Sequence, residues 1–212
     1  MENSNHEERP IFPTSYFPSI AYMSALARHS EILVEHHETF PKQTLRNRMV
    51  IPTANGAQTL SVPVVRPIGT HTPTNQIEIS YAERWNIIHW RTIVTAYTAS
   101  PYFLYYGDGI ETILTKRYKY LTELNDAIMA YLIKSLHIEC TIKATTTYSR
   151  PEETKQDYRD AFSYKHPDTT IQYPHYTQVF SDRQPFNSNV SVLDLLFNLG
   201  PQSKDYLRRI IA

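Results

Sequence analysis

The chain has 212 residues, and its 21 lysines and arginines balance 21 aspartates and glutamates, so the formal net charge is zero. That balance argues against general binding to nucleic acid or to a membrane surface, because both need a basic excess. The length suffices for one domain whose core needs no disulfide or metal, and we expect that domain over residues 11–212, after a polar, disordered N-terminus at residues 1–10.

The first predicted elements are a strand, a helix and a second strand. Pro18 suits the first turn of a helix, and Ile20 and Met23 follow it at helical spacing. The three elements are a strand at 11–15, a helix from 18 to about 28 and a strand at 31–35. Two strands joined by a helix pair in parallel with a right-handed crossover, so this unit indicates an α/β fold.

Turn chemistry predicts a hairpin in the next segment. The pair Asn55-Gly56 readily takes the positive φ angles of a tight turn, and it lies between two segments with strand character. The predicted strands lie at 48–51 and 59–65, with a further strand at 77–81.

The pattern then becomes helical. Trp85, His89 and Ala96 lie on one stripe of a helix predicted for residues 82–99, and Ser100-Pro101 ends it. Beyond it we predict helices at 110–118 and 121–136 and a strand at 138–143.

Near the C-terminus, Ser191 and Asp194 match a capping box before an apolar helix. Gly200-Pro201 ends that helix, and a last helix follows at 204–211. These elements predict a single-domain α/β fold with a mixed β-sheet that begins with the strand, helix, strand unit, flanking helices and a helical C-terminus. The polar, Tyr-rich segment 145–174 is either functional or poorly ordered, because ordinary connections are shorter.

Cysteine usage and hydropathy predict the compartment. Cys140 is the only cysteine, so a reducing compartment is the simpler assumption. The acidic N-terminus is unlike a signal peptide, and no apolar run approaches the ~20 residues that span a bilayer. We expect a cytoplasmic protein without an integral membrane segment, and a homo-oligomer stays open.

Three cations in one short segment predict an anion site. Lys42, Arg46 and Arg48 supply positive charge, and arginine can grip a phosphate or carboxylate with two donors. Asn47 between the arginines would orient the ligand. The alternative is a solvated strand edge whose charges block aggregation.

Histidines are the candidates for proton transfer. His36 and His37 face opposite ways in a strand, so the pair forms no chelate, and one of them should point into a cleft. His89 lies one turn after Trp85, where burial would lower its pKa and fit it to act as a base. The alternative is a core histidine that bonds to a carbonyl or a tyrosine hydroxyl. No HExxH motif or cysteine partner occurs, so we expect no metal.

Other reactive side chains have simpler explanations. Cys140 alternates with apolar residues and fits a small core side chain better than a nucleophile. Asp194 is explained by helix capping, with a site carboxylate as the alternative. The charged residues of the Tyr-rich segment either close over a ligand as a lid or belong to a solvated loop. They are Asp157, Arg159, Asp160 and Lys165.

Several separated motifs together resemble the WbqC-like family. They are Tyr16-x-Pro18, KQTLRNR at 42–48, Asn55-Gly56, LSVPV at 60–64, Trp85-x-x-x-His89-Trp90, Pro101-x-Phe103, Asp157-Tyr158-Arg159 and SVLDLLFNLGP at 191–201. Their order and spacing are more specific than any single motif. EHHETF at 35–40 departs from the acidic pair followed by Val-Gln that many relatives carry.

The resemblance implies a bacterial origin and a role in surface polysaccharide of the O-antigen kind. One activity that it suggests is an amide-forming acyl or aminoacyl transfer to an amino sugar, with an acyl thioester or nucleotide sugar as donor. Arg46, Asn47, Arg48 and His89 fall on family motif positions, as does Asp194, which stays divided between cap and site.

We therefore expect a transferase that holds a small anionic ligand with Lys42, Arg46 and Arg48 and uses His89 as the base. Five further residues are predicted to bind substrate, namely Tyr16, His37, Trp85, Tyr97 and Asp194. A glycan- or nucleotide-binding protein without catalysis is the rival interpretation. A third is that His89 and the arginines only hold a core network together.

Overall fold

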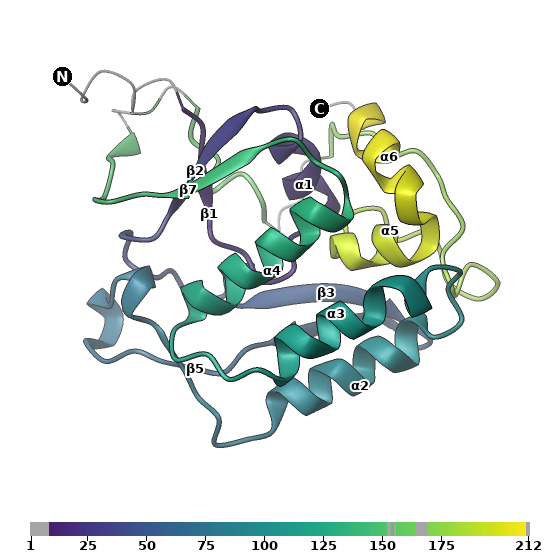
Figure 1. The fold of residues 1–212 in the computed structure, drawn as a ribbon, viewed down its shortest axis with the longest axis horizontal. Helices are drawn as coiled ribbons and strands as arrows, with labels where there is room; N and C mark the ends of the chain where they lie inside the picture. Colours follow the sequence, from purple (N-terminus) through teal and green to yellow (C-terminus); the bar gives the residue numbers. More distant parts are fainter. Residues whose placement is uncertain (1–8, 152–153, 155, 164–168, 211–212) are drawn as a thin grey trace.

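The computed structural model describes residues 9–151, 154, 156–163 and 169–210. Most of the N-terminus that we expected to be disordered lies outside these residues, and so does Lys165. Within the described ranges, the predicted α/β fold class is confirmed (Figure 1).

A small parallel sheet is built from the predicted strand, helix, strand unit and one later strand. Its elements are β1 (Ile11–Pro13), α1 (Ile20–Leu26), β2 (Glu31–Glu35) and β7 (Thr141–Ala144). β2 lies in the middle and pairs in parallel with both neighbours. The carboxyl ends of all three strands therefore meet at one edge of the sheet, where ligands bind in many α/β proteins.

Antiparallel strands form two further small sheets and do not extend the first one. Their strands are β3 (Arg48–Thr53), β4 (Gly56–Ser61), β5 (Val64–Val65) and β6 (Glu78–Ile79). β3 pairs with β4 as the predicted hairpin, and Gly56 has the positive φ of 103° that the turn requires. β5 pairs with β6. Two single 3-10 turns, Gly69–His71 and Thr74–Gln76, lie between them.

Three helices follow in the middle of the chain. They are α2 (Trp85–Tyr97), α3 (Phe103–Thr115) and α4 (Leu121–Ser135). The helix predicted to begin at 110 begins seven residues earlier, although its first turns contain Gly107 and Gly109. A side chain at Gly109 would collide with the ring of Tyr131 on α4, so close helix packing explains a residue of low helix propensity there.

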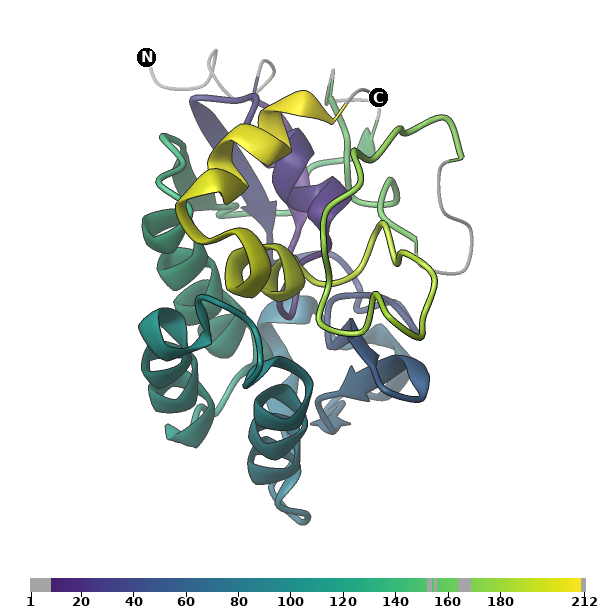
Figure 2. The same ribbon diagram turned by 90° about the vertical axis from the view of Figure 1, so that its right-hand side faces the viewer.

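The C-terminal helices are α5 (Val192–Leu199) and α6 (Ser203–Arg209), separated by a 3-10 turn at Gly200–Gln202. Ser191 caps α5 as predicted, with its Oγ accepting a hydrogen bond from Leu193 N at 3.3 Å. The prediction that Asp194 completes the capping box is wrong, because its carboxylate turns into the core and accepts hydrogen bonds from Tyr176 and Gln178. Figure 2 shows α5 and α6 beside α1, and the three helices are in contact.

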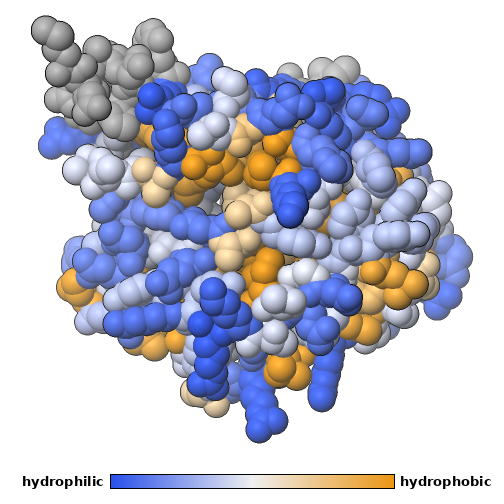
Figure 3. Space-filling model, in the orientation of Figure 1, coloured by the Kyte–Doolittle hydropathy of each residue, from blue (hydrophilic) through white to orange (hydrophobic). Residues whose placement is uncertain are grey.

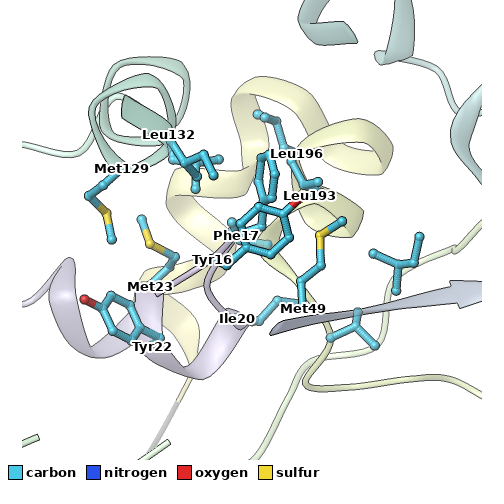
Figure 4. Packing of buried hydrophobic residues seen from close by; sticks show 14 of the residues in the cluster. Tyr16, Phe17, Ile20, Tyr22, Met23, Met49, Met129, Leu132, Leu193 and Leu196 are labelled. Carbon is cyan, nitrogen blue, oxygen red and sulfur yellow. The ribbon is translucent and has the colours of Figure 1, made fainter. Parts of the chain in front are cut away.

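The core lies where α1, α4 and α5 meet. Figure 4 shows Tyr16 and Phe17, on the link between β1 and α1, surrounded by side chains from all three helices. Tyr16, Phe17, Met23 and Leu193 are at most 1% exposed. Burial of these aromatic side chains contributes to the hydrophobic stabilisation of the domain.

Candidate functional site

Three arginines border one cavity of about 330 Å³, which we call the arginine cavity. Its walls are the loop before β3, the β3–β4 hairpin and residues 159–163 of the Tyr-rich segment. The polar side chains that line it are Gln43, Thr44, Arg46, Arg48, Thr59, Arg159, Asp160 and Ser163. The predicted pair Arg46 and Arg48 therefore does lie in one wall of a cavity.

Arg46 is held by a two-pronged ion pair. Its Nε and Nη2 donate to the two carboxylate oxygens of Glu38 at 2.6 and 2.9 Å, and Nη2 also donates to the carbonyl of Arg159 at 3.2 Å. The arginine is only 4% exposed. Burial raises the pKa of Glu38 above its ordinary value, and the Arg46 guanidinium opposes that rise. Arg46 is thus a fixed charge with little freedom to move.

Arg159 is fixed in the same way from the other wall. Its guanidinium donates to both oxygens of Asp157, at 2.6 Å for the shortest contact, and to the carbonyl of Ser149 at 2.7 Å. Hydrogen bonds to Asp157 raise the pKa of Arg159. Burial acts to raise the pKa of Asp157, but the Arg159 hydrogen bonds outweigh it and hold that pKa below its usual range.

A buried carboxylate links this arrangement to the parallel sheet. Glu35, the last residue of β2, is fully buried. Its Oε1 accepts from the Thr145 hydroxyl at 2.8 Å and from His37 N at 2.7 Å, and its Oε2 lies 3.4 Å from Arg159 Nη1. The carboxyl end of β2 thereby positions Arg159 from a distant part of the chain.

Arg48 differs from the other two arginines of the cavity. Its Nε is buried and has no hydrogen-bond partner among the described residues, and the same holds for the Thr44 hydroxyl in the same cavity. Buried polar atoms normally have partners, so these two are available to a bound molecule. Lys42 is exposed and is not among the residues that line the cavity.

Asn47 serves the hairpin. Its Nδ2 donates to the carbonyl of Val62 at 2.9 Å, and its own carbonyl accepts from Val62 N at 2.8 Å. Asn47 thus joins the segment before β3 to the residue that follows β4.

His89 lies in the core and does not border the arginine cavity. Its Nδ1 is 2.8 Å from the Tyr16 hydroxyl, and its ring packs at 5.1 Å against Trp85. Burial lowers the pKa of His89 to about 4, as predicted, and burial raises that of Tyr16. Tyr16, Trp85 and His89, three of the predicted site residues, thus come together here, and none of them lines the arginine cavity.

The adjacent histidines at the end of β2 are tied to their neighbours. His37 Nε2 lies 3.1 Å from the carbonyl of Thr145 and Nδ1 lies 3.3 Å from Asn75 Nδ2. A carbonyl can only accept, so Nε2 carries the proton and Nδ1 accepts. His36 Nε2 lies 3.3 Å from Asp126 Oδ1. His37 therefore has both ring nitrogens engaged within the protein.

Asp194 is a buried carboxylate with hydroxyl and amide partners. Tyr176 donates to its Oδ2 at 2.5 Å and Gln178 donates at 2.7 Å. Burial raises the pKa of Asp194 to about 6, and these donors oppose the rise. Its Oδ1 and the Tyr97 hydroxyl are both buried and make no hydrogen bond of normal geometry in the described part of the chain, although burial and the nearby Asp194 carboxylate raise the pKa of Tyr97.

Among the described residues, no three or more His, Cys, Asp or Glu side chains are grouped to hold a metal ion. In the same ranges, no helix is both long and apolar enough to cross a bilayer.

The fold and the cavity define an α/β protein whose RNR motif lines an arginine-rich cavity. The family model described as "WbqC-like protein family" matches residues 14–162, so the chain belongs to the WbqC-like family. The C-terminal motif at 191–201 lies outside that match. Membership suggests a polysaccharide-related role.

One curated relative is similar over nearly its whole length. "Uncharacterized protein Rv1507c" of Mycobacterium tuberculosis (strain ATCC 25618 / H37Rv) is 27% identical over 228 residues, which cover 93% of this chain and 96% of the relative. No solved structure gives a significant match.

The sequence pointed neither to Arg159 as a residue of the cavity nor to the carboxylates that bind the arginines. Arg159 was assigned only to a lid or a solvated loop, although it is 6% exposed and fixed against Asp157. The motif Asp157-Tyr158-Arg159 was the available signal. Glu35 and Glu38 belong to none of the motifs that the chain shares with the family, so only their contacts with the arginines identify them.

Proposed function

We propose that the protein is a transferase of surface polysaccharide or glycoconjugate synthesis that binds the anionic part of an activated donor in the arginine cavity. The single observation that carries this proposal is Arg48, whose buried Nε lacks a partner beside two arginines that are already neutralised. A cation left without its counterion inside a cavity favours an anionic ligand.

Arg48 differs from the other arginines of the cavity in its charge partners. Glu38 pairs with Arg46, and Asp157 and Glu35 pair with Arg159. Arg48 has no ion pair among the described residues, and it lines the same cavity as the Thr44 hydroxyl and the Asp160 carboxylate. A phosphate or carboxylate would satisfy Arg48 and the Thr44 hydroxyl, since it accepts several hydrogen bonds at once.

The size of the cavity limits which part of a donor it can hold. Its volume of about 330 Å³ is at the lower end of ligand sites. Nucleotide sugars and acyl-coenzyme A thioesters share a diphosphate, and a diphosphate with part of its attached group suits this volume. The transferred group would be an acyl, aminoacyl or sugar unit, and an amino sugar would be the acceptor.

His89 keeps a supporting role in this proposal. Its Nδ1 is engaged with Tyr16 and its side chain is 4% exposed. A base must reach the proton that it removes within about 3 Å, directly or through one water. The position of His89 favours the core-network interpretation, in which it holds Tyr16 and the link between β1 and α1.

Thermal unfolding with three probes tests anion binding. We expect inorganic pyrophosphate, UDP-glucose or acetyl-coenzyme A to raise the Tm, because a ligand at about 100 times its Kd adds ~2.7 kcal/mol to the free energy of unfolding. The Arg48→Gln variant should lose the shift, and the matched Lys42→Gln variant should keep it. No shift with any probe, or equal shifts in both variants, would contradict the proposal.

A binding protein without turnover is the second candidate. It is favoured by the lining of the arginine cavity, where the described residues include no histidine or cysteine to act as base or nucleophile. Incubation of the stabilising donor with an amino sugar distinguishes the two. Release of coenzyme A or of UDP that requires the protein supports the transferase, whereas binding without release across a panel of acceptors supports the second candidate.

A further inference from the structure

A second cavity, of about 390 Å³, lies between α4 and the parallel sheet; we call it the α4 cavity. Residues of β2 and β7 line one side, residues of α4 line the other, and the residues just after β1 close one end. Figure 3 shows hydrophobic side chains gathered on the front face, where α4 and β7 lie in Figure 1. None of its lining residues lines the arginine cavity.

One end of the α4 cavity is apolar. Met129 and Ile133 of α4 face it from one side, and Ile142 and Val34 line it from the strands. Apolar walls of this kind bind the hydrocarbon part of a small molecule through the hydrophobic effect. A ligand here would therefore need an apolar body.

Asn125, another residue of the lining, has a hydrogen-bond acceptor that the described part of the protein leaves unused. Asn125 is 1% exposed, and its Nδ2 donates to Thr14 Oγ1 at 3.0 Å and to the carbonyl of Arg46 at 2.8 Å. A carbonyl only accepts, so the amide orientation is fixed. The Asn125 Oδ1 is buried without a partner among the described residues, and such an atom normally costs stability unless a bound molecule satisfies it.

Two of the three hydroxyl groups in the lining already donate within the protein, and the third, that of Thr14, accepts from Asn125. Tyr22 donates to the carbonyl of Pro13 at 2.8 Å, and Ser15 donates to the carbonyl of Leu45 at 3.3 Å. The carboxylate of Asp126, which is about half exposed, adds another acceptor to the same lining. The polar end thus presents acceptors and negative charge.

We propose that the α4 cavity binds a small primary amine with an apolar body, whose N–H groups bond to Asn125 Oδ1 and to the Asp126 carboxylate. The donor groups of the ligand face Asn125, its apolar body lies against Met129 and Ile142, and its positive charge is balanced by Asp126. An alcohol shares the hydrogen-bond donor but lacks the charge, so it binds the same place more weakly. This assignment stands whether or not the arginine cavity binds an anion.

Cys140 reports on the occupancy of this cavity. It is the only cysteine of the chain, and it is among the residues that line the α4 cavity. Burial raises its pKa to about 11, so it reacts slowly near neutral pH. Dithiodipyridine reacts with the thiol but not with amines, and it releases one coloured thiopyridone for each Cys140 that becomes a mixed disulfide.

The experiment compares the labelling rate of Cys140 with hexylamine, hexanol and hexanoate. We expect hexylamine to slow labelling of the wild-type protein at the lowest concentration, hexanol to need more, and hexanoate to have no effect because Asp126 repels it. No protection by hexylamine, or equal protection by hexanoate, overturns the proposal. Hexanol acting as well as hexylamine overturns the assignment of an amine.

Two variants localise the effect. Asp126→Asn should weaken protection by hexylamine by roughly tenfold, the usual difference between a charged and a neutral hydrogen bond, and should leave hexanol unchanged. Ala130→Phe, at an exposed position of α4 in the same lining, should remove protection by both probes. Asp108→Asn on α3 is the matched control and should behave as wild type. Unchanged protection in Ala130→Phe and Asp126→Asn would place the probes elsewhere and overturn the site.

Discussion

The arginine cavity and the Tyr16–His89 pair handle buried ionisable groups in opposite ways. Around the cavity, Arg46 and Arg159 each pair with a carboxylate at 2.6 Å. In the core, the one hydrogen-bond partner of His89 among the described residues is the Tyr16 hydroxyl, and burial lowers the pKa of His89 to about 4. Arg46 and His89 both fall on family motif positions and both have ionisable side chains. Arg46 lies in a charged cavity and His89 in a neutral part of the core, so a shared motif does not imply a shared role.

The largest expected effect tests the charged region. Arg46→Ala leaves the Glu38 carboxylate buried without its cation, so we expect the free energy of unfolding in urea to fall by about 3–5 kcal/mol. Lys42→Ala, at an exposed position in the same segment, is the control and should change it by less than about 0.5 kcal/mol. Similar stability in both variants would mean that the cavity does not depend on fixed charge.

The next effect concerns the neutral pair and its dependence on pH. The pKa of His89 falls from 6.5 to about 4 on folding, so the unfolded chain binds more protons between these values and stability rises with pH there. The pKa of Asp194 rises from 3.8 to about 6, so the folded chain binds more protons and stability falls as pH rises. The two contributions oppose each other between about pH 4 and 6.

Single variants separate these opposing slopes. His89→Gln should lower the pH slope of unfolding free energy in this window by up to about 1.4 kcal/mol per pH unit, and Asp194→Asn should raise it by a similar amount. Urea titrations at several pH values between 4 and 6 measure both. If the two variants changed the slope in the same direction, the contrast between the regions would fail.

A smaller effect compares two tyrosine hydroxyls near Asp194, of which that of Tyr176 donates a hydrogen bond to the carboxylate. Tyr176→Phe removes the 2.5 Å donor to the carboxylate and should cost about 1–3 kcal/mol. Tyr97→Phe removes a buried hydroxyl without a hydrogen-bond partner in the described ranges, so it should be close to neutral or slightly stabilising. Thermal unfolding of both variants measures the difference, and a larger loss for Tyr97→Phe would show that its hydroxyl does bond to Asp194.

Local patterns in the sequence predicted most elements of the fold. The β3–β4 hairpin follows from Asn55-Gly56, and the parallel pair β1 and β2 follows from two apolar runs around a helix. The early start of α3 was missed because Gly109 lowers helix propensity, while its packing against Tyr131 is a tertiary contact.

The site was predictable only in part. Arg46 and Arg48 were found from charge density and lie in one cavity wall. The contact of Arg159 with Glu35 joins residues 124 apart in the chain, and no local pattern announces it. His89 carries the same signal whether it is a base or a core residue, since burial and an aromatic stripe accompany both. The predicted roles of Tyr16, His37, Trp85, Tyr97 and Asp194 in substrate binding stay predictions.

Arg46 contributes to both cavities through different atoms. Its guanidinium lines the arginine cavity, while its backbone carbonyl accepts the hydrogen bond that fixes Asn125 in the α4 cavity. A molecule bound in either cavity therefore acts on the same residue. By thermodynamic linkage, if one ligand changes the affinity for the other by some factor, the second changes the affinity for the first by the same factor. Titration of one ligand into protein saturated with the other therefore measures the coupling between the two cavities.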